Sequence, residues 1–166
     1  MVVFDKIVSS IDSISVKISL GHKSIQAYSP LDQMILPRVF FDGASQNDIC
    51  GCGVQICMDN NLQYQIHWNG RSGSNIKVED MALAGLLFLC HFLNIQSLHI
   101  YGDSKVIIEH VTEKHHIKNQ YLDSWMYRIM TLWKGMEGYS ISHIYKSQNV
   151  QADILSKKGL LSCLGI

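Results

Sequence analysis

Four acidic residues each stand in a different local pattern of this 166-residue chain. Asp42 lies in FFDGAS, Glu79 in SNIKVEDMAL, Asp103 in HIYGDSK and Asp153 in NVQADILSKKG. Carboxylates that converge on one point can hold two Mg²⁺ ions about 4 Å apart, and such a pair of ions can hydrolyse a phosphodiester. The four residues are far apart in the sequence, so only a fold can bring them together. The patterns therefore predict a two-metal nuclease site.

Each acid taken alone has a simpler explanation. The pair Asp42-Gly43 is typical of a turn, and Asp103 followed by serine is typical of a helix cap. Glu79 fits an ordinary acid in the first turn of a helix, where the helix dipole favours it, and Asp153 fits a solvated helix residue. Four such acids, in order and each at the edge of a predicted element, make independent coincidence the harder explanation.

The composition is that of one domain. A chain of 166 residues with 47% hydrophobic content can bury a single sizeable core. No run of eighteen apolar residues occurs, and the first residues, MVVFDKIVSSIDS, differ from a secretory segment. We therefore expect a cytoplasmic or nuclear monomer that has no membrane partner. Five cysteines, an odd number, indicate reduced thiols rather than disulfides.

The formal net charge is zero, which argues against strong nonspecific binding of polyanions. A role with nucleic acid then depends on metal ions or a local basic patch. Cys50, Cys52 and Cys57 have spacings that resemble a metal site, but they lack an obvious fourth ligand. We interpret them as small buried residues.

Both prolines, Pro30 and Pro37, precede the first clear strand. We therefore divide the chain into a lead-in extension (1–37), a catalytic domain (38–160) and a C-terminal tail (161–166). The stretch ISVKISL in the extension alternates weakly and could add a strand. In the catalytic domain, PRVFFDGAS predicts a short buried strand that ends in a turn. GVQICMD and LQYQIHW flank Asn60-Asn61, which predicts a hairpin.

The rest of the chain alternates helices and strands. A helical period from Val78 to Leu93 is followed by the strand SLHIYG, and Ser104 can cap the next helix, SKVIIEHVTEK. The remaining predicted elements are a helix from about Gln120 to Met136, in which Trp125 and Trp133 pack in the core, the strand YSISHIY, and a final helix, VQADILSKKG, that Gly159 closes.

The resulting order, β-β-β-α-β-α-α-β-α, resembles the ribonuclease H fold, an α/β fold with a mixed five-stranded sheet flanked by helices. The family motifs stand here as Asp42-Gly43-Ala44-Ser45, Asn75-Ile76-Lys77-Val78-Glu79, Asp103-Ser104 and Asn149-Val150-Gln151-Ala152-Asp153. The resemblance extends from about Leu36 to Gly159. The short Asn-x-x-Ala-Asp ending is similar to that of the type 1 domains of plants, many of them retroelement-derived.

The resemblance implies how the site is used. Asp42 would bridge two Mg²⁺ ions, for which Mn²⁺ could substitute, Glu79 and Asp103 would complete one side, and Asp153 would ligate the second ion. One ion would activate water and the other would stabilise the leaving 3′ oxygen, which gives a 5′-phosphate product. The residues implied in substrate binding are Gly43, Ala44, Ser45, Ser74, Asn75, Ser104 and Asn149, of which Asn149 is expected to orient the loop of the last acid.

The implied function is an endoribonuclease that cuts the RNA strand of a duplex, with an RNA/DNA hybrid as the favoured substrate. Double-stranded RNA is an alternative, for example in defence against RNA elements. A catalytically idle module that binds nucleic acid or protein is another. A DNA nuclease or transposase core is disfavoured, because Glu79 in the first helix belongs to the ribonuclease pattern.

The sequence departs from the family pattern at three places. HIYKSQNVQAD is too short for the Gly-His loop that precedes the last acid in bacterial and animal members. We expect slow turnover, and we interpret His143 as a strand residue rather than a mobile catalytic histidine. HHIKNQY replaces the Lys/Trp-rich handle, so the grip on a hybrid should be weaker. Ile76 stands where the family has a second amide, which could relax selectivity towards double-stranded RNA.

Overall fold

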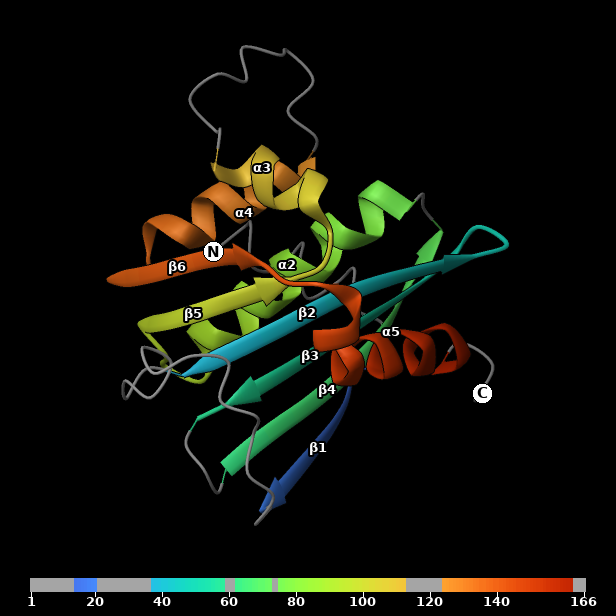
Figure 1. The fold of residues 1–166 in the computed structure, drawn as a ribbon, viewed down its shortest axis with the longest axis horizontal. Coiled ribbons are helices and arrows are strands. Elements are labelled where there is room, and N and C mark those ends of the chain that lie inside the picture. The colour runs from blue at the N-terminus through green and yellow to red at the C-terminus, as the bar shows by residue number, and fades with distance from the viewer. Residues whose placement is uncertain (1–13, 21–36, 59–61, 73–74, 113–123, 163–166) are drawn as a thin grey trace.

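The computed structural model describes residues 14–20, 37–58, 62–72, 75–112 and 124–162 (Figure 1). The described residues form a six-stranded mixed sheet with helices on both faces. In sheet order, the strands are β1 (Ile14–Leu20), β4 (Leu62–Ser72), β3 (Ile49–Cys57), β2 (Arg38–Gln46), β5 (Ser97–Gly102) and β6 (Gly138–His143). Pairs β1–β4, β4–β3 and β3–β2 are antiparallel, whereas β2–β5 and β5–β6 are parallel.

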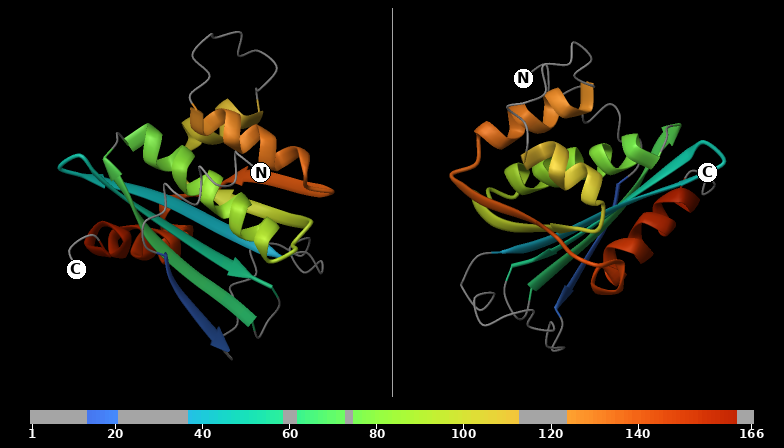
Figure 2. Two further views of the ribbon diagram at one scale, coloured as in Figure 1. Left: turned by 180° about the vertical axis from the view of Figure 1, so that it is seen from behind. Right: turned by 45° about the horizontal axis from the view of Figure 1, so that its top comes forward.

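The helices divide between the two faces of this sheet. They are α2 (Asn75–Phe92), α3 (Lys105–Thr112), α4 (Ser124–Lys134), the 3₁₀ turn η2 (Lys146–Gln148) and α5 (Val150–Ser162). Helix α2 covers β2 and β3 on one face and packs against α4, whereas α5 crosses β2, β3 and β4 on the other (Figure 2). None of the helices within the described residues is long and apolar enough to cross a membrane.

The five predicted strands are present as β2 to β6, and the predicted order of strands and helices is confirmed. The sheet has a sixth strand, because the ISVKISL stretch forms β1 and pairs with β4 from Ile14↔Trp68 to Leu20↔Leu62. A segment of the predicted lead-in extension thus belongs to the same sheet as the strands of the 38–160 segment. The predicted Asn60-Asn61 turn lies outside the described residues, although the antiparallel pairing of β3 and β4 on either side is confirmed.

The predicted end of the first strand in the 38–160 segment is wrong. β2 does not stop at Asp42-Gly43 but runs on to Gln46 and pairs with β3 along its whole length. The turn lies instead at Asn47 and Asp48, which have φ angles of 52° and 63°. Asn and Asp tolerate this left-handed conformation, which a two-residue hairpin turn requires. Asp42 therefore lies in the middle of a strand.

One continuous apolar core lies between the sheet and the helices on the side of α2. Trp125 and Trp133 on α4 are buried in it, as predicted, and so are Cys50 and Cys52 on β3. Cys57 is buried as well, and all three are free cysteines, which agrees with their interpretation as small packing residues.

Helix α5 packs unusually close to the sheet because glycines meet at the contact. A Cβ atom on Gly51 would lie 2.1 Å from the Ser156 carbonyl oxygen, and one on Gly53 would lie 2.3 Å from the Ser156 nitrogen. Gly159 does not close the helix as predicted, because α5 continues to Ser162. A Cβ on Gly159 would come within 2.5 Å of the Trp68 carbonyl oxygen. This glycine permits close approach rather than a helix end.

Candidate active site

Three of the four predicted acids meet beside the middle of β2. The parallel register pairs Phe41 with Gly102, so Asp42 lies next to the end of β5, where Asp103 follows. Helix α2 brings Glu79 to the same place, because a Cβ on Gly43 would lie only 2.7 Å from the Val78 carbonyl carbon. One oxygen from each of Asp42, Glu79 and Asp103 lies within 4.8 Å of the other two.

Burial and mutual repulsion make this cluster costly to ionise. The pKa of Asp42 rises from 3.8 to about 7, chiefly because burial removes the carboxylate from water; the neighbouring carboxylates Asp103 and Asp153 add to the rise, and a hydrogen bond from Ser156 opposes it. Desolvation, followed by the charges of Asp42 and Asp103, raises the pKa of Glu79 from 4.5 to about 9. A bound cation would remove both penalties, because it supplies the missing positive charge.

The donor atoms fit a hard divalent cation. Glu79 Oε2 and Asp103 Oδ2 are buried and have no hydrogen-bond partner within the described part of the chain. Buried polar atoms without a partner are rare in folded proteins and need an explanation. A set of carboxylate oxygens is the ligand type that Mg²⁺ and Mn²⁺ prefer. The three residues can therefore hold such an ion.

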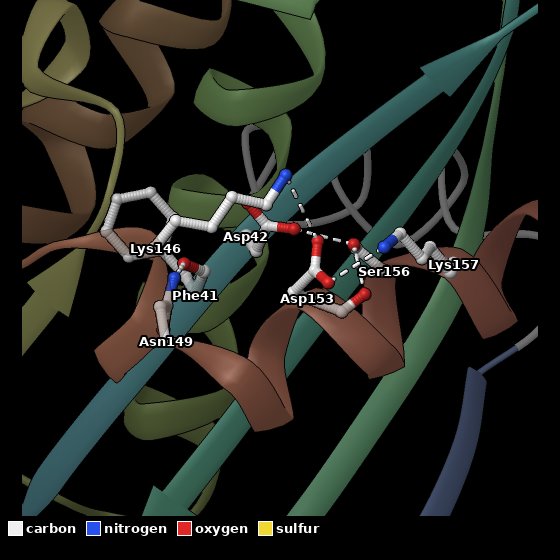
Figure 3. Close-up of polar contacts among 7 residues, drawn as sticks. All are labelled: Phe41, Asp42, Lys146, Asn149, Asp153, Ser156 and Lys157. Atoms are coloured by element: carbon white, nitrogen blue, oxygen red, sulfur yellow. Dashed lines mark hydrogen bonds and ion pairs between the residues drawn. The ribbon is translucent and has the colours of Figure 1, made fainter.

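Ser156 on α5 fixes the orientation of Asp42. Its side chain is fully buried, and its hydroxyl Oγ donates to Asp42 Oδ2 at 2.6 Å (Figure 3). The same Oγ lies 2.8 Å from the carbonyl oxygen of Asp153. A hydrogen bond to a carboxylate stabilises its charged form, so Ser156 opposes part of the burial penalty of Asp42. Ser156 was not among the site residues predicted from the sequence.

Asp153 lies in the same cavity but outside the group of three. Its carboxylate pairs with two lysines: Oδ1 lies 3.7 Å from Lys146 Nζ, and Oδ2 lies 2.9 Å from Lys157 Nζ (Figure 3). Of the four carboxylates expected to meet at one place, three form the close group, and the fourth lies in the same cavity paired with two lysines. Lys157 follows Asp153 by four residues on a helix, a spacing that predicts such a pair. Lys146 carries no such signal in the sequence.

The four acids line one open cavity of about 450 Å³. Four of the predicted substrate-binding residues also line it: Gly43, Ala44, Ser45 and Ser104. Val106, Lys146 and Lys157 are further lining residues, which the sequence analysis did not identify. Ser74 lies outside the described residues. Asn75 begins α2, but its side chain is not among those described.

Asn149 does not line the cavity but forms hydrogen bonds that hold the neighbouring backbone in place. Its side chain is 1% exposed, and Nδ2 donates to the Phe41 carbonyl oxygen at 2.9 Å. This burial argues against the predicted direct contact with a substrate. The Asn149 carbonyl oxygen in turn accepts a bond from the Asp153 amide, so the expectation that Asn149 orients the last acid fits this geometry.

His143 is the last residue of β6, in agreement with its interpretation as a strand residue. Its ring is exposed, and Nε2 lies 3.2 Å from the carbonyl oxygen of Asp103. It does not line the cavity described above.

The chain matches solved structures of ribonucleases H. RNase H1 from the halophilic archaeon Halobacterium salinarum NRC-1 is 21% identical, with a TM-score of 0.67 over 75% of this chain and 96% of its own. LC11-RNase H1, isolated from compost by a metagenomic approach, is 20% identical, with a TM-score of 0.67 over 80% of this chain and 100% of its own. A structure of LC11-RNase H1 in complex with an RNA/DNA hybrid matches at 18% identity and a TM-score of 0.64, over 78% of this chain and 99% of its own. At these identities the likeness shows the fold.

No curated protein matches the chain. The family model described as "Reverse transcriptase-like" matches residues 40–159. This match covers most of the chain and includes Asp42, Glu79, Asp103 and Asp153. The chain therefore belongs to the reverse transcriptase-like family of ribonuclease H domains.

Proposed function

We propose that this protein is a divalent-metal-dependent endoribonuclease that hydrolyses the RNA strand of an RNA/DNA hybrid. The observation that carries the proposal is the close group of buried Asp42 and half-buried Glu79 and Asp103 at an open cavity, in which one oxygen each of Glu79 and Asp103 is buried without a partner. Raised pKa values of Asp42 and Glu79 support it, because burial and then the repulsion between the carboxylates oppose ionisation until a cation is bound. The hybrid bound by LC11-RNase H1 supports the choice of substrate class.

In this proposal Asp42, Glu79 and Asp103 hold one ion, and Asp153 serves a second ion together with Asp42. Mg²⁺ is the proposed cofactor, and Mn²⁺ substitutes for it. When bound, the ions activate water and stabilise charge on the leaving oxygen. Ser156 and Asn149 attach the segment that carries Asp153 to β2, and they thereby hold the carboxylates of Asp153 and Asp42 in position. One chain supplies the described residues that line the cavity, so the proposed activity needs no second copy, and we propose a monomer.

The rest of the cavity is assigned to the substrate. Gly43, Ala44 and Ser45 along β2, with Ser104 before α3, present backbone groups and hydroxyls to the nucleic acid. Ser74 and Asn75 remain predicted contacts to the phosphate and minor groove. Ile76 stands where the family has a second amide, which favours double-stranded RNA as the second candidate substrate. The plant-type, retroelement-derived subtype also remains a prediction.

Cleavage of matched, end-labelled duplexes tests the proposal. Purified protein is incubated in Mg²⁺ with RNA/DNA, RNA/RNA, DNA/DNA and single-stranded RNA of one sequence. We expect cleavage of the RNA strand in the hybrid, 5′-phosphate products, and loss of activity in EDTA. Asp42→Asn should abolish cleavage without unfolding, whereas Glu109→Gln, the same type of change at an exposed acid of α3, should not.

The outcomes separate the candidate functions. Cleavage of RNA/RNA at least as fast as of the hybrid would make double-stranded RNA the main substrate. No cleavage of any substrate by folded protein in Mg²⁺ or Mn²⁺ would refute a nuclease and favour an idle binding module. Wild-type activity in folded Asp42→Asn would refute the site.

A further inference from the structure

Two lysines from separate elements form ion pairs with Asp153, the fourth acid of the site. Lys146 lies in η2, between β6 and α5, and Lys157 lies one helical turn beyond Asp153 on α5. Each ammonium meets a different oxygen of Asp153 (Figure 3). Both lysines line the cavity that Asp42, Glu79 and Asp103 also line. The lysine side chains are 74% and 62% exposed, whereas that of Asp153 is 18% exposed. Positive charge therefore lies at the solvent side of an acidic cavity.

This pairing conflicts with the binding of a cation at Asp153. Both of its oxygens face an ammonium, and a divalent ion placed there would be repelled by two positive charges. The pairs are also easy to separate, because exposed ion pairs contribute little to stability and water screens them. Lys146 and Lys157 can therefore leave Asp153 when a better anion or a competing cation arrives.

A phosphodiester backbone supplies that anion. Lysine is a flexible point charge that binds phosphate well, and its long side chain can move between partners. The chain has no net charge, so its contacts with a polyanion must come from local groups such as these. Lys146 and Lys157 are the lysines among the residues that line the cavity.

We propose that Lys146 and Lys157 form a phosphate-binding pair that exchanges partners. In the free protein they neutralise Asp153, and in the complex they bind backbone phosphates of the substrate while Asp153 takes a divalent cation. This inference rests on the proposed function and deepens it. By linkage, a cation at Asp153 releases the lysines for phosphate, and phosphate removes the lysines from Asp153, so each ligand favours the other.

The exchange predicts two effects of opposite sign. Replacing both lysines with glutamine removes the charges that compete at Asp153, so divalent ions should bind more tightly in the absence of nucleic acid. The same change removes two phosphate contacts, so a duplex should bind more weakly. Lysines that merely hold the fold together would not strengthen one binding event and weaken the other.

The experiment compares the double variant Lys146→Gln/Lys157→Gln with Lys134→Gln/Lys158→Gln, which loses the same charge at exposed positions outside the cavity. Binding of Mn²⁺ to the free proteins is measured by calorimetry. We expect the Mn²⁺ dissociation constant of the weaker site to fall at least threefold in the first variant and to stay unchanged in the second.

Binding of a fluorescent RNA/DNA hybrid is then measured by anisotropy in Mg²⁺ at several KCl concentrations. All the proteins in this arm carry Glu79→Gln, so that the hybrid is not cut. The plot of log association constant against log[KCl] has a negative slope, which should become less steep by about 2 when two phosphate contacts are lost. Affinity at low salt should fall roughly tenfold. The control pair should change the slope by less than half as much.

The results separate this inference from the function on which it rests. If the wild-type protein cleaves no hybrid in Mg²⁺, the proposed function fails, and the exchange fails with it. If the Glu79→Gln reference protein binds the hybrid but loss of Lys146 and Lys157 leaves its affinity and salt slope unchanged, the exchange alone is overturned. Weaker or unchanged Mn²⁺ binding in the free variant would also overturn it.

Discussion

The buried carboxylates should make the metal-free protein less stable as pH rises. Asp42 has an ordinary pKa of 3.8 in the unfolded chain and of about 7 in the folded protein. Between these values the folded state binds a proton that the unfolded state has released, so stability is greatest at low pH and is lost as pH rises. At about 1.4 kcal/mol per pKa unit, the stability lost through Asp42, relative to low pH, is about 4 kcal/mol at pH 8 and about 2 kcal/mol at pH 5.5.

Glu79 acts in the same direction over a higher range, since its pKa rises from 4.5 to about 9. Urea unfolding in EDTA at pH 5.5, 7 and 8.5 measures the effect. We expect wild-type stability to fall across this range. Asp42→Asn, which keeps an oxygen to accept the Ser156 hydrogen bond but carries no charge, should be more stable than wild type by about 2–4 kcal/mol at pH 8.5. The advantage should shrink at pH 5.5.

Divalent cations should restore the stability that the protein loses at high pH. Mg²⁺ at 100 times its dissociation constant stabilises a protein by about 3 kcal/mol, and this gain should be much smaller in Asp42→Asn. Glu109→Gln, an exposed acid in a helix, serves as the control and should follow wild type. Wild-type stability that is flat or rises between pH 5.5 and 8.5 in EDTA would refute the argument, as would an Asp42→Asn protein that is less stable than wild type at pH 8.5.

Two further changes test how α5 supports the site. Ser156→Ala should weaken Mg²⁺ binding roughly tenfold in calorimetry, because hydrogen bonds to charged groups contribute about 1.5–3 kcal/mol and Asp42 would lose its buried donor. Ser162→Ala, which removes a hydroxyl farther along α5, should leave Mg²⁺ binding unchanged, and equal effects would contradict a specific role. Gly159→Ala should lower the free energy of unfolding by about 2 kcal/mol in urea, because its Cβ would meet backbone atoms of β3 and β4. Lys158→Ala is the exposed control, and a stabilised Gly159→Ala would show that helix propensity outweighs packing.

The order of elements was predictable because apolar runs, periodic stretches and family motifs mark them, whereas two glycines were misinterpreted. Gly43 follows an aspartate and looks like part of a turn, yet it lies within β2 and leaves room for the backbone of α2. Gly159 looks like a helix end, yet it lies inside α5 against the backbone of Trp68. A glycine that permits a tertiary contact has the same local signature as one that permits a turn.

The site was predictable in its acids and less so in what surrounds them. Asp42, Glu79 and Asp103 stand in family motifs, and the order of these motifs along the chain indicates that the three acids meet in the fold. The partners of Asp153 are not part of these motifs. Lys157 follows it by four residues and could have been found on a helix, whereas Lys146 reaches it only through the path of the chain between β6 and α5.

The contact between Ser156 and Asp42 links the packing of α5 to the chemistry of the site. A serine side chain is short, so it can reach the strand only if the helix lies very close to the sheet. Gly51 and Gly53 on β3 allow that approach. Helix α5 is then attached to two consecutive residues of β2, through Asn149 to the Phe41 carbonyl and through Ser156 to the Asp42 carboxylate. A substitution that lifts α5 from the sheet must therefore disturb the orientation of Asp42 as well as the core, so its effect on Mg²⁺ binding should exceed what the loss of stability alone would cause.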